Sequence, residues 1–242
     1  ACIIFPVSIL VDGSLTKIER DRIFVIYIIA FFVIFFWAAY EQAGASLTLF
    51  AAEQTDRTIF GWEMPASWIQ SFNPFFVVIL AAIMPSVWGA LNKRGMEPAS
   101  PTKQAIGLLL LSLGYLVICF GVKDVQPGVK VSLIWLTGLY FIHTMGEIAL
   151  SPIGLSMVNK LTPVRFASLM MGIWYLSTST ANKFAGTLGG LYPEDGKVKT
   201  LLGFRIETMF DFFMVFVIMS GVASLILFLL SKKLQKMMHG VE

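Results

Sequence analysis

Charged residues and cysteines are scarce in this chain of 242 residues. Only 14% of its residues are charged and 57% are hydrophobic, whereas an average soluble domain has about 25% charged residues and a smaller apolar share. An ordinary soluble fold is therefore excluded. The two cysteines, Cys2 and Cys119, lie in apolar runs without Cys-x-x-Cys or Cys/His spacing, so neither a disulfide framework nor a zinc site is indicated.

Motifs of enzymes and of cofactor sites are also missing. The chain has no glycine-rich phosphate loop, no HExxH pair and no Ser/His/Asp arrangement, the patterns typical of phosphate, zinc and nucleophilic chemistry. We therefore expect no enzyme activity, no cofactor and no metal site. The formal net charge is +3, but the basic residues gather at the ends of apolar runs and form no single basic face. A nucleic-acid partner is not expected.

Six long apolar segments are present, at residues 23–52, 65–91, 104–122, 131–158, 166–191 and from 204 or later to 230. A helix needs about 20 apolar residues to cross a bilayer, and these runs lack the alternation of a transmembrane β-barrel. We predict an all-α membrane protein with six transmembrane helices in a lipid bilayer. Residues 1–22 are predicted to hold the end of a preceding helix and a cytosolic linker, and residues 23–242 the transmembrane bundle.

Lysines and arginines are shared unevenly between alternate connectors. Eleven lie on the side that includes both ends of the chain, and six lie on the other side. Because basic residues are enriched in cytoplasmic loops, both ends are predicted to be cytosolic. The short connectors further indicate an integral protein of a bacterial inner membrane. The remaining basic residue, Lys183, falls within the fifth segment at a depth from which its amine can reach the outer interface, and a buried functional charge is the alternative.

Two glutamates, Glu41 and Glu147, lie inside the first and fourth segments with apolar residues on both sides. A carboxylate at such depth is costly unless it is protonated, paired or hydrated, so both are candidates for proton or substrate handling. The alternative is a protonated glutamate bonded to a neighbouring helix. Residues four apart share a helix face, which places Trp37 beside Glu41. The same spacing places His143 and Ser151 beside Glu147, although a packing role is the preferred interpretation of His143.

Polar residues also interrupt the second and fifth segments. Asn73 lies in a short polar stretch of the second segment, and its amide can both donate to and accept from a ligand. In the fifth segment Trp174, Ser177 and Thr178 share one helix face. Trp174 is too deep for an interfacial aromatic belt. For a single asparagine or tryptophan, helix packing is the alternative.

Three stretches of the chain resemble one transporter family. FFWAAYEQAGASLTLFAAEQTDR, at residues 35–57, resembles the seventh span of the proton-coupled oligopeptide transporters, a branch of the major facilitator superfamily. SWIQSFNPFF, at residues 67–76, resembles the eighth span, and GEIALSPIGLSMVNKLTPVRFASLMMGIWYLS, at residues 146–177, resembles the tenth and eleventh. The motifs occur in the family's order. The resemblance therefore implies that the chain is the C-terminal six-helix bundle of such a transporter.

The resemblance implies one half of a twelve-helix carrier whose two bundles rock around a central site. Such a carrier couples inward proton movement to the uptake of di- and tripeptides. The resemblance assigns proton coupling and outer-gate closure to Glu41, and binding of the peptide's amino terminus to Asn73 and Glu147. The other implied positions are the pocket walls Trp37 and Trp174, the pocket residues Ser151 and Ser177 (with Thr178 as the alternative), and the inner-gate residue Leu155.

The family's N-terminal half, with its ExxERFxYY motif, is not in this sequence. We therefore expect an N-terminal six-helix bundle of the same transporter as the partner of this chain, with the proton as coupling ion. Two alternatives remain: a carrier of the same family for another solute such as nitrate, and an ion-translocating subunit of a respiratory membrane complex. A nitrate carrier needs no carboxylate for an ammonium, and a respiratory subunit favours central lysines that this chain lacks.

Overall fold

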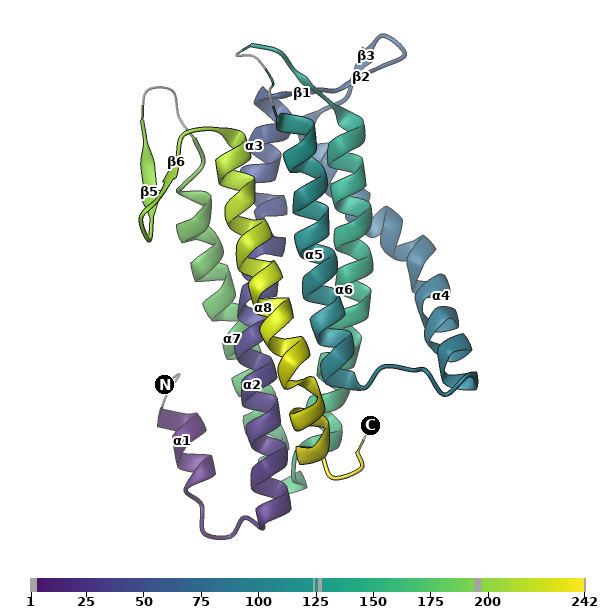
Figure 1. Cartoon of the computed structure of the whole chain (residues 1–242), viewed down its shortest axis with the longest axis vertical. Helices are drawn as coiled ribbons and strands as arrows, with labels where there is room; N and C mark the ends of the chain where they lie inside the picture. The colour runs from purple at the N-terminus through teal and green to yellow at the C-terminus, as the bar shows by residue number, and fades with distance from the viewer. Residues whose placement is uncertain (1–3, 124, 126–127, 194–196, 242) are drawn as a thin grey trace.

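The computed structural model describes residues 4–123, 125, 128–193 and 197–241, and Figure 1 shows long helices running side by side. Cys2 lies outside the described residues. The helices are α1 (Ile4–Leu10), α2 (Lys17–Tyr40), α3 (Ser46–Glu53), α4 (Phe72–Lys93), α5 (Ser100–Val122), α6 (Leu133–Leu161), α7 (Ala167–Gly189) and α8 (Met209–Met237). Three 3-10 turns, η1 (Glu41–Gly44), η2 (Ala66–Ser71) and η3 (Val164–Phe166), precede α3, α4 and α7.

Five segments of the described chain are long and apolar enough to cross a membrane: Lys17–Glu53, Ala66–Lys93, Ser100–Val122, Leu133–Leu161 and Met209–Met237. The predicted helical membrane fold is confirmed to this extent. The predicted fifth span, now α7, is not among them, because residues 177–183 read Ser-Thr-Ser-Thr-Ala-Asn-Lys and lower its hydropathy. Helix α7 nevertheless packs along α2, so it belongs to the bundle.

Helix α2 begins at Lys17, within the predicted linker and before the apolar run at residue 23. The reason is a capping box. The Thr16 hydroxyl accepts a hydrogen bond from the Glu19 backbone N–H at 3.2 Å, and Glu19 Oε2 accepts one from the Thr16 N–H at 2.8 Å. Two N–H groups that a helix start leaves without partners are thereby satisfied. The apolar run therefore marks where the helix is buried, and the polar cap marks where it begins.

The first predicted span is not one continuous helix. It is broken at η1, which places Glu41 at the end of α2 and not in mid-helix as the sequence suggested. Gln42 is completely buried at the break, and its amide donates to Ala38 O at 3.1 Å and to Ala185 O of α7 at 2.9 Å. The Ser46 hydroxyl donates to Gln42 Oε1 at 2.6 Å. These bonds satisfy backbone and side-chain groups that the interrupted helix would otherwise leave unpaired in an apolar core.

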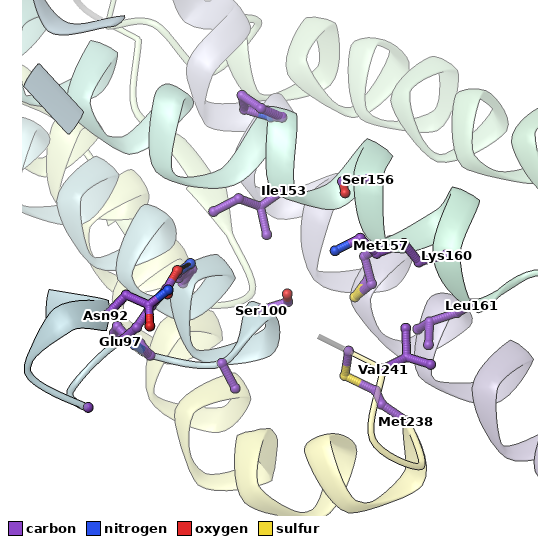
Figure 2. Close-up of a pocket in the computed structure, with 15 residues that line it drawn as sticks. Asn92, Glu97, Ser100, Ile153, Ser156, Met157, Lys160, Leu161, Met238 and Val241 are labelled. Atoms are coloured by element: carbon purple, nitrogen blue, oxygen red, sulfur yellow. Dashed lines mark hydrogen bonds and ion pairs between the residues drawn. The ribbon is translucent and has the colours of Figure 1, made fainter. Parts of the chain in front are cut away.

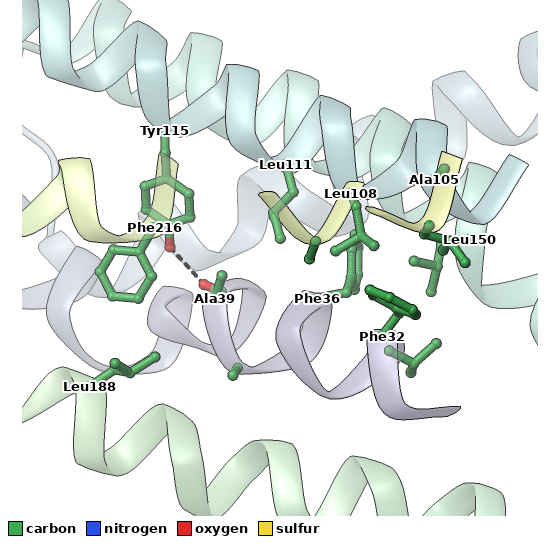
Figure 3. Packing of buried hydrophobic residues seen from close by; sticks show 14 of the residues in the cluster. Phe32, Phe36, Ala39, Ala105, Leu108, Leu111, Tyr115, Leu150, Leu188 and Phe216 are labelled. Atoms are coloured by element: carbon green, nitrogen blue, oxygen red, sulfur yellow. Dashed lines mark hydrogen bonds between the residues drawn. The ribbon is translucent and has the colours of Figure 1, made fainter. Parts of the chain in front are cut away.

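The core lies where α2, α5, α6 and α8 meet, as Figure 3 shows for part of it. Tyr115 of α5 is fully buried, stacks on Phe216 of α8 with ring centroids 4.8 Å apart, and donates a hydrogen bond to Ala39 O of α2 at 2.6 Å. That carbonyl belongs to the last turn of α2, where the break leaves carbonyls without helical partners. The same tyrosine therefore packs the core and caps the broken helix.

Helix α4 stands apart from the other helices in Figure 1. It contacts α6 and its own leading turn η2, and only Leu80 and Met84 on it are buried.

The connectors that follow α3, α5 and α7 form short strand pairs. Strand β1 (Thr55–Asp56) pairs in parallel with β4 (Val131–Ser132). Two pairs are antiparallel: β2 (Thr58–Ile59) with β3 (Trp62–Glu63), and β5 (Lys199–Leu201) with β6 (Phe204–Ile206). The sequence did not predict these strands.

Close approach of α5 and α6 requires glycine at position 114. A Cβ atom built there would lie 2.3 Å from His143 Cδ2 and 2.7 Å from His143 Nε2. We expect Gly114→Ala to displace the imidazole and lower the free energy of unfolding by about 1–3 kcal/mol, the usual cost of overpacking. Thermal unfolding of the purified protein measures this. Gly172→Ala in α7 is the matched control, because a Cβ atom there meets nothing within 4 Å; equal melting temperatures for the two variants would contradict the prediction.

Candidate functional site

Side chains from α2, α4 and α6 converge on the Glu147 carboxylate. The Tyr40 hydroxyl donates to Glu147 Oε2 at 2.5 Å, and the Asn73 amide donates to the same oxygen at 2.8 Å. Asn73 Nδ2 also lies within hydrogen-bond distance of the Tyr40 hydroxyl oxygen and, at 3.2 Å, of Thr144 Oγ1, so its two N–H groups are shared among three acceptors. We call these four residues, Tyr40, Asn73, Thr144 and Glu147, the carboxylate cluster. It joins three helices through one acidic oxygen.

Local structure explains how each member reaches this point. Tyr40 is the last residue of α2, immediately before the break. Asn73 lies in the first turn of α4 because the 3-10 turn η2 ends at Ser71. Thr144 and Glu147 are three apart on α6 and therefore share a face, and the Thr144 hydroxyl donates to its own helix at Tyr140 O, 2.8 Å away. The cluster thus lies where two helix ends meet the middle of a third helix.

The cluster is acidic and half-buried. Within the described residues, Glu147 accepts hydrogen bonds from Tyr40 and Asn73 and forms no ion pair with a lysine or arginine. The Asn73 carbonyl oxygen has no hydrogen-bond donor in that part of the chain. A carboxylate in a poorly solvated place attracts a cation, and an amide oxygen beside it can accept a second N–H. This arrangement suits a small ligand that carries an ammonium group.

Glu41 lies next to the cluster in the chain but is exposed, and its carboxylate makes no hydrogen bond among the described residues. Trp37, one turn earlier, is half-buried, and its ring meets the Tyr40 ring edge-on with centroids 5.3 Å apart. Trp37 therefore borders the carboxylate cluster. Glu41 is a separate acid on the accessible side of the break.

His143 does not join Glu147, although the two are four residues apart. It is 3% exposed, and its Nε2 lies 3.1 Å from Leu111 O of α5, a carbonyl that requires the proton to be on Nε2. The ring also packs on Tyr115 with centroids 4.7 Å apart. The preferred interpretation of His143 as a packing residue agrees with this, because the imidazole turns toward α5 although His143 shares a helix face with Glu147.

Among the described residues, no hydrogen bond or ring contact joins the aromatic and hydroxyl positions of α7 to the cluster. Trp174 is buried against α6, where a Cβ atom at Gly154 would lie 2.6 Å from its Cζ2. The buried Ser177 hydroxyl donates to Trp174 O at 2.6 Å in its own helix, whereas the half-buried Thr178 makes no side-chain hydrogen bond among the described residues. Of the two alternatives for this position, Thr178 therefore has the available hydroxyl.

Ser151 and Leu155 lie on α6 beyond Glu147, and both are half-buried. Leu155 packs against the main hydrophobic core. The Ser151 hydroxyl has no hydrogen-bond partner among the described residues. Neither residue touches the carboxylate cluster through a hydrogen bond, so their assigned roles stay predictions.

A pocket of about 640 Å³ lies further along α6, as Figure 2 shows. It is bounded by residues 92–103 at the ends of α4 and α5, by residues 152–161 of α6 and by Met238 and Val241. Lys103 in this pocket forms an ion pair with Glu97. None of the residues of the carboxylate cluster lines it, so it is not part of the candidate site.

Sequence reasoning missed two members of the cluster, Tyr40 and Thr144. A signal existed for Thr144, because it precedes Glu147 by three residues and so lies on the same helix face. No comparable signal existed for Tyr40. Its contacts with Asn73 and Glu147 join residues 33 and 107 positions apart in the chain, and the helix break that brings them together has no clear sequence marker.

Comparison with known proteins gives consistent matches. Residues 7–200 match the POT family. The peptide transporter YePEPT of Yersinia enterocolitica is 37% identical over 185 residues, which cover 76% of this chain and 36% of that protein. The dipeptide and tripeptide permease A of Escherichia coli is 30% identical over 218 residues, which cover 90% of this chain and 43% of the permease.

Solved structures agree with this result. A crystal structure of a mutant of a peptide transporter POT in complex with alafosfalin superimposes with a TM-score of 0.84 at 30% identity, over 99% of this chain and 47% of that one. The chain thus spans less than half the length of the relatives described here. On the match over residues 7–200, the chain belongs to the POT family of transporters.

Proposed function

We propose that this chain is the C-terminal half of a proton-coupled symporter of di- and tripeptides, and that the carboxylate cluster binds the amino terminus of the peptide. The relatives named as peptide transporters support the substrate class. The observation that carries the proposal is the convergence of Asn73 and Glu147, with the amide nitrogen 2.8 Å from the carboxylate oxygen. A peptide ammonium carries three N–H donors, and the carboxylate with the amide oxygen of Asn73 supplies acceptors for them.

The full protein would be a twelve-helix carrier that works by alternating access. In this proposal α7 is the sixth crossing of the present half, and an N-terminal six-helix bundle is its obligatory partner. The share of each relative that the chain covers, between 36% and 47%, supports a missing half. The excess of basic residues on one side supports cytosolic ends and an inner-membrane location.

The remaining site residues keep the roles that the family resemblance implies. Glu41, exposed at the break, would exchange the coupling proton and close the outer gate. Trp37 would form a pocket wall beside Tyr40, which it contacts edge-on. Trp174, Ser151 and Ser177 or Thr178 would line the pocket toward α7, and Leu155 would belong to the inner gate. No cofactor other than the proton is proposed.

The test is uptake of labelled dialanine into proteoliposomes that contain the full-length transporter, under an inward proton gradient. We expect uptake that depends on the gradient and that unlabelled di- and tripeptides suppress. Suppression by nitrate, with no effect of peptides, would overturn the peptide assignment in favour of an anion carrier of the same family. Uptake that is unaffected when the gradient is collapsed would overturn the proton coupling.

A further inference from the structure

The Tyr40 hydroxyl occupies an acceptor position of Glu147 that a ligand amine could use. It donates to Glu147 Oε2 at 2.5 Å, and the same oxygen accepts from Asn73 at 2.8 Å. An ammonium that binds Glu147 also donates N–H bonds to a carboxylate oxygen. The phenol therefore acts as an internal substitute for the amine, and Oε2 already has two donors before any ligand arrives.

We propose that Tyr40 determines the specificity of the amine site by competing with the ligand's ammonium for Glu147. This inference rests on the proposed function, because it concerns the site assigned to the peptide's amino terminus. In the empty site the hydroxyl satisfies a carboxylate that would otherwise be poorly solvated. A peptide with a free ammonium displaces the hydroxyl and places a charged donor at Oε2. A ligand without a charged amine does not gain enough to displace it.

The surroundings of Tyr40 allow the hydroxyl to leave while the ring stays packed. The ring stacks on Phe36 at 5.5 Å with an interplanar angle of 17°, and meets Trp37 edge-on at 5.3 Å. Both of these neighbours belong to α2, and the ring also lies against His143 of α6 with centroids 6.2 Å apart, so it is held by packing that does not involve the hydroxyl. The hydroxyl is held only by Glu147 and Asn73, which belong to the other two helices. Removing the hydroxyl therefore leaves the aromatic packing intact and changes only the cluster.

The size of the effect follows from the bond that competes. A hydrogen bond to a charged group contributes about 1.5–3 kcal/mol, which corresponds to roughly 10- to 100-fold in a dissociation constant. In the wild-type protein the displaced hydroxyl can form another hydrogen bond, which offsets part of the affinity that the peptide loses by displacing it. For Tyr40→Phe we therefore expect dialanine to bind about tenfold more tightly, the low end of that range.

The experiment compares the wild-type full-length transporter with Tyr40→Phe, using dialanine and N-acetyl-dialanine as probes in equilibrium competition against a labelled dipeptide. The acetylated probe has no ammonium, so its affinity is expected to stay within about twofold, since its neutral amide N–H gains much less from the vacated carboxylate oxygen than a charged donor does. The ratio of the two affinities is a readout that a merely structural role would not move. Tyr27→Phe is the matched control: this half-buried tyrosine of α2 donates to Pro6 O at 3.2 Å, away from the cluster.

The outcomes separate this inference from the function on which it rests. If the wild-type protein binds no dialanine, the proposed function fails and the inference falls with it. If the wild-type protein binds dialanine but Tyr40→Phe binds it equally well or more weakly, Tyr40 is not a competitor and only the inference is overturned. Equal tightening for both probes would also overturn it, because the gain would then not depend on the ammonium. The phenylalanine keeps the ring, so the variant is expected to fold, and its melting temperature checks this.

Discussion

Replacing Glu147 with glutamine is expected to reduce the affinity for dialanine by about a hundredfold. Truncation of a partner in a buried charge pair costs about 2–5 kcal/mol, and about 3 kcal/mol corresponds to roughly a hundredfold. The glutamine keeps the shape of the side chain but removes the negative charge that the peptide ammonium would meet. Equilibrium binding to the full-length transporter in detergent measures the change, without interference from proton driving forces.

Two controls make the Glu147→Gln result interpretable. The glutamine carbonyl can still accept from Tyr40 and Asn73, so the melting temperature is expected to stay close to that of the wild-type protein. Glu207→Gln provides the matched charge change elsewhere, because Glu207 is exposed and pairs with Arg205 at 2.7 Å outside the membrane spans. That variant should bind dialanine normally. Normal binding by Glu147→Gln would remove the carboxylate cluster from the peptide site.

Much of the architecture was accessible from the sequence because hydrophobic runs report burial in lipid directly. The apolar segments at 104–122 and 131–158 correspond closely to α5 and α6. The helix ends were less accessible, because they depend on polar caps such as Thr16 with Glu19, which lie outside the apolar runs. For helix α7, hydropathy understates its place in the bundle. Its polar residues 177–183 carry little hydropathy, and its place in the bundle comes from packing along α2.

Only part of the candidate site could be predicted from the sequence. Residue patterns alone left Glu41 and Glu147 as two costly acids of similar kind, and the family resemblance then paired Asn73 with Glu147, which lie 2.8 Å apart in the structure. The break at η1 could not be read from the sequence. It depends on Gln42, whose amide bonds to Ala185 O, 143 residues further along the chain. A local pattern does not report such a tertiary bond, and the break is what separates the surroundings of Tyr40 from those of Glu41.

Glu41→Gln is expected to abolish proton-driven accumulation of dialanine while leaving peptide exchange without a gradient nearly unchanged. Glu41 is exposed at the helix break and its carboxylate has no hydrogen-bond partner among the described residues, whereas the Glu147 carboxylate is half-buried and accepts two hydrogen bonds. The first arrangement leaves an acid free to take up and release a proton, and the second suits holding a ligand. A glutamine at position 41 cannot exchange a proton, so the proton gradient can no longer shift the equilibrium between the conformations of the carrier.

Paired assays in proteoliposomes distinguish the two acids. Uptake driven by an inward proton gradient measures coupling, and counterflow of labelled against unlabelled dialanine measures binding and movement of the loaded carrier. Glu41→Gln should lose the first and keep the second, and Glu147→Gln should lose both, because without its ammonium partner the carrier is not loaded. Wild-type accumulation by Glu41→Gln would remove Glu41 from coupling. Loss of counterflow in both variants would mean that Glu41 is also needed to load or move the carrier, and the separate roles given to the two acids would then be wrong.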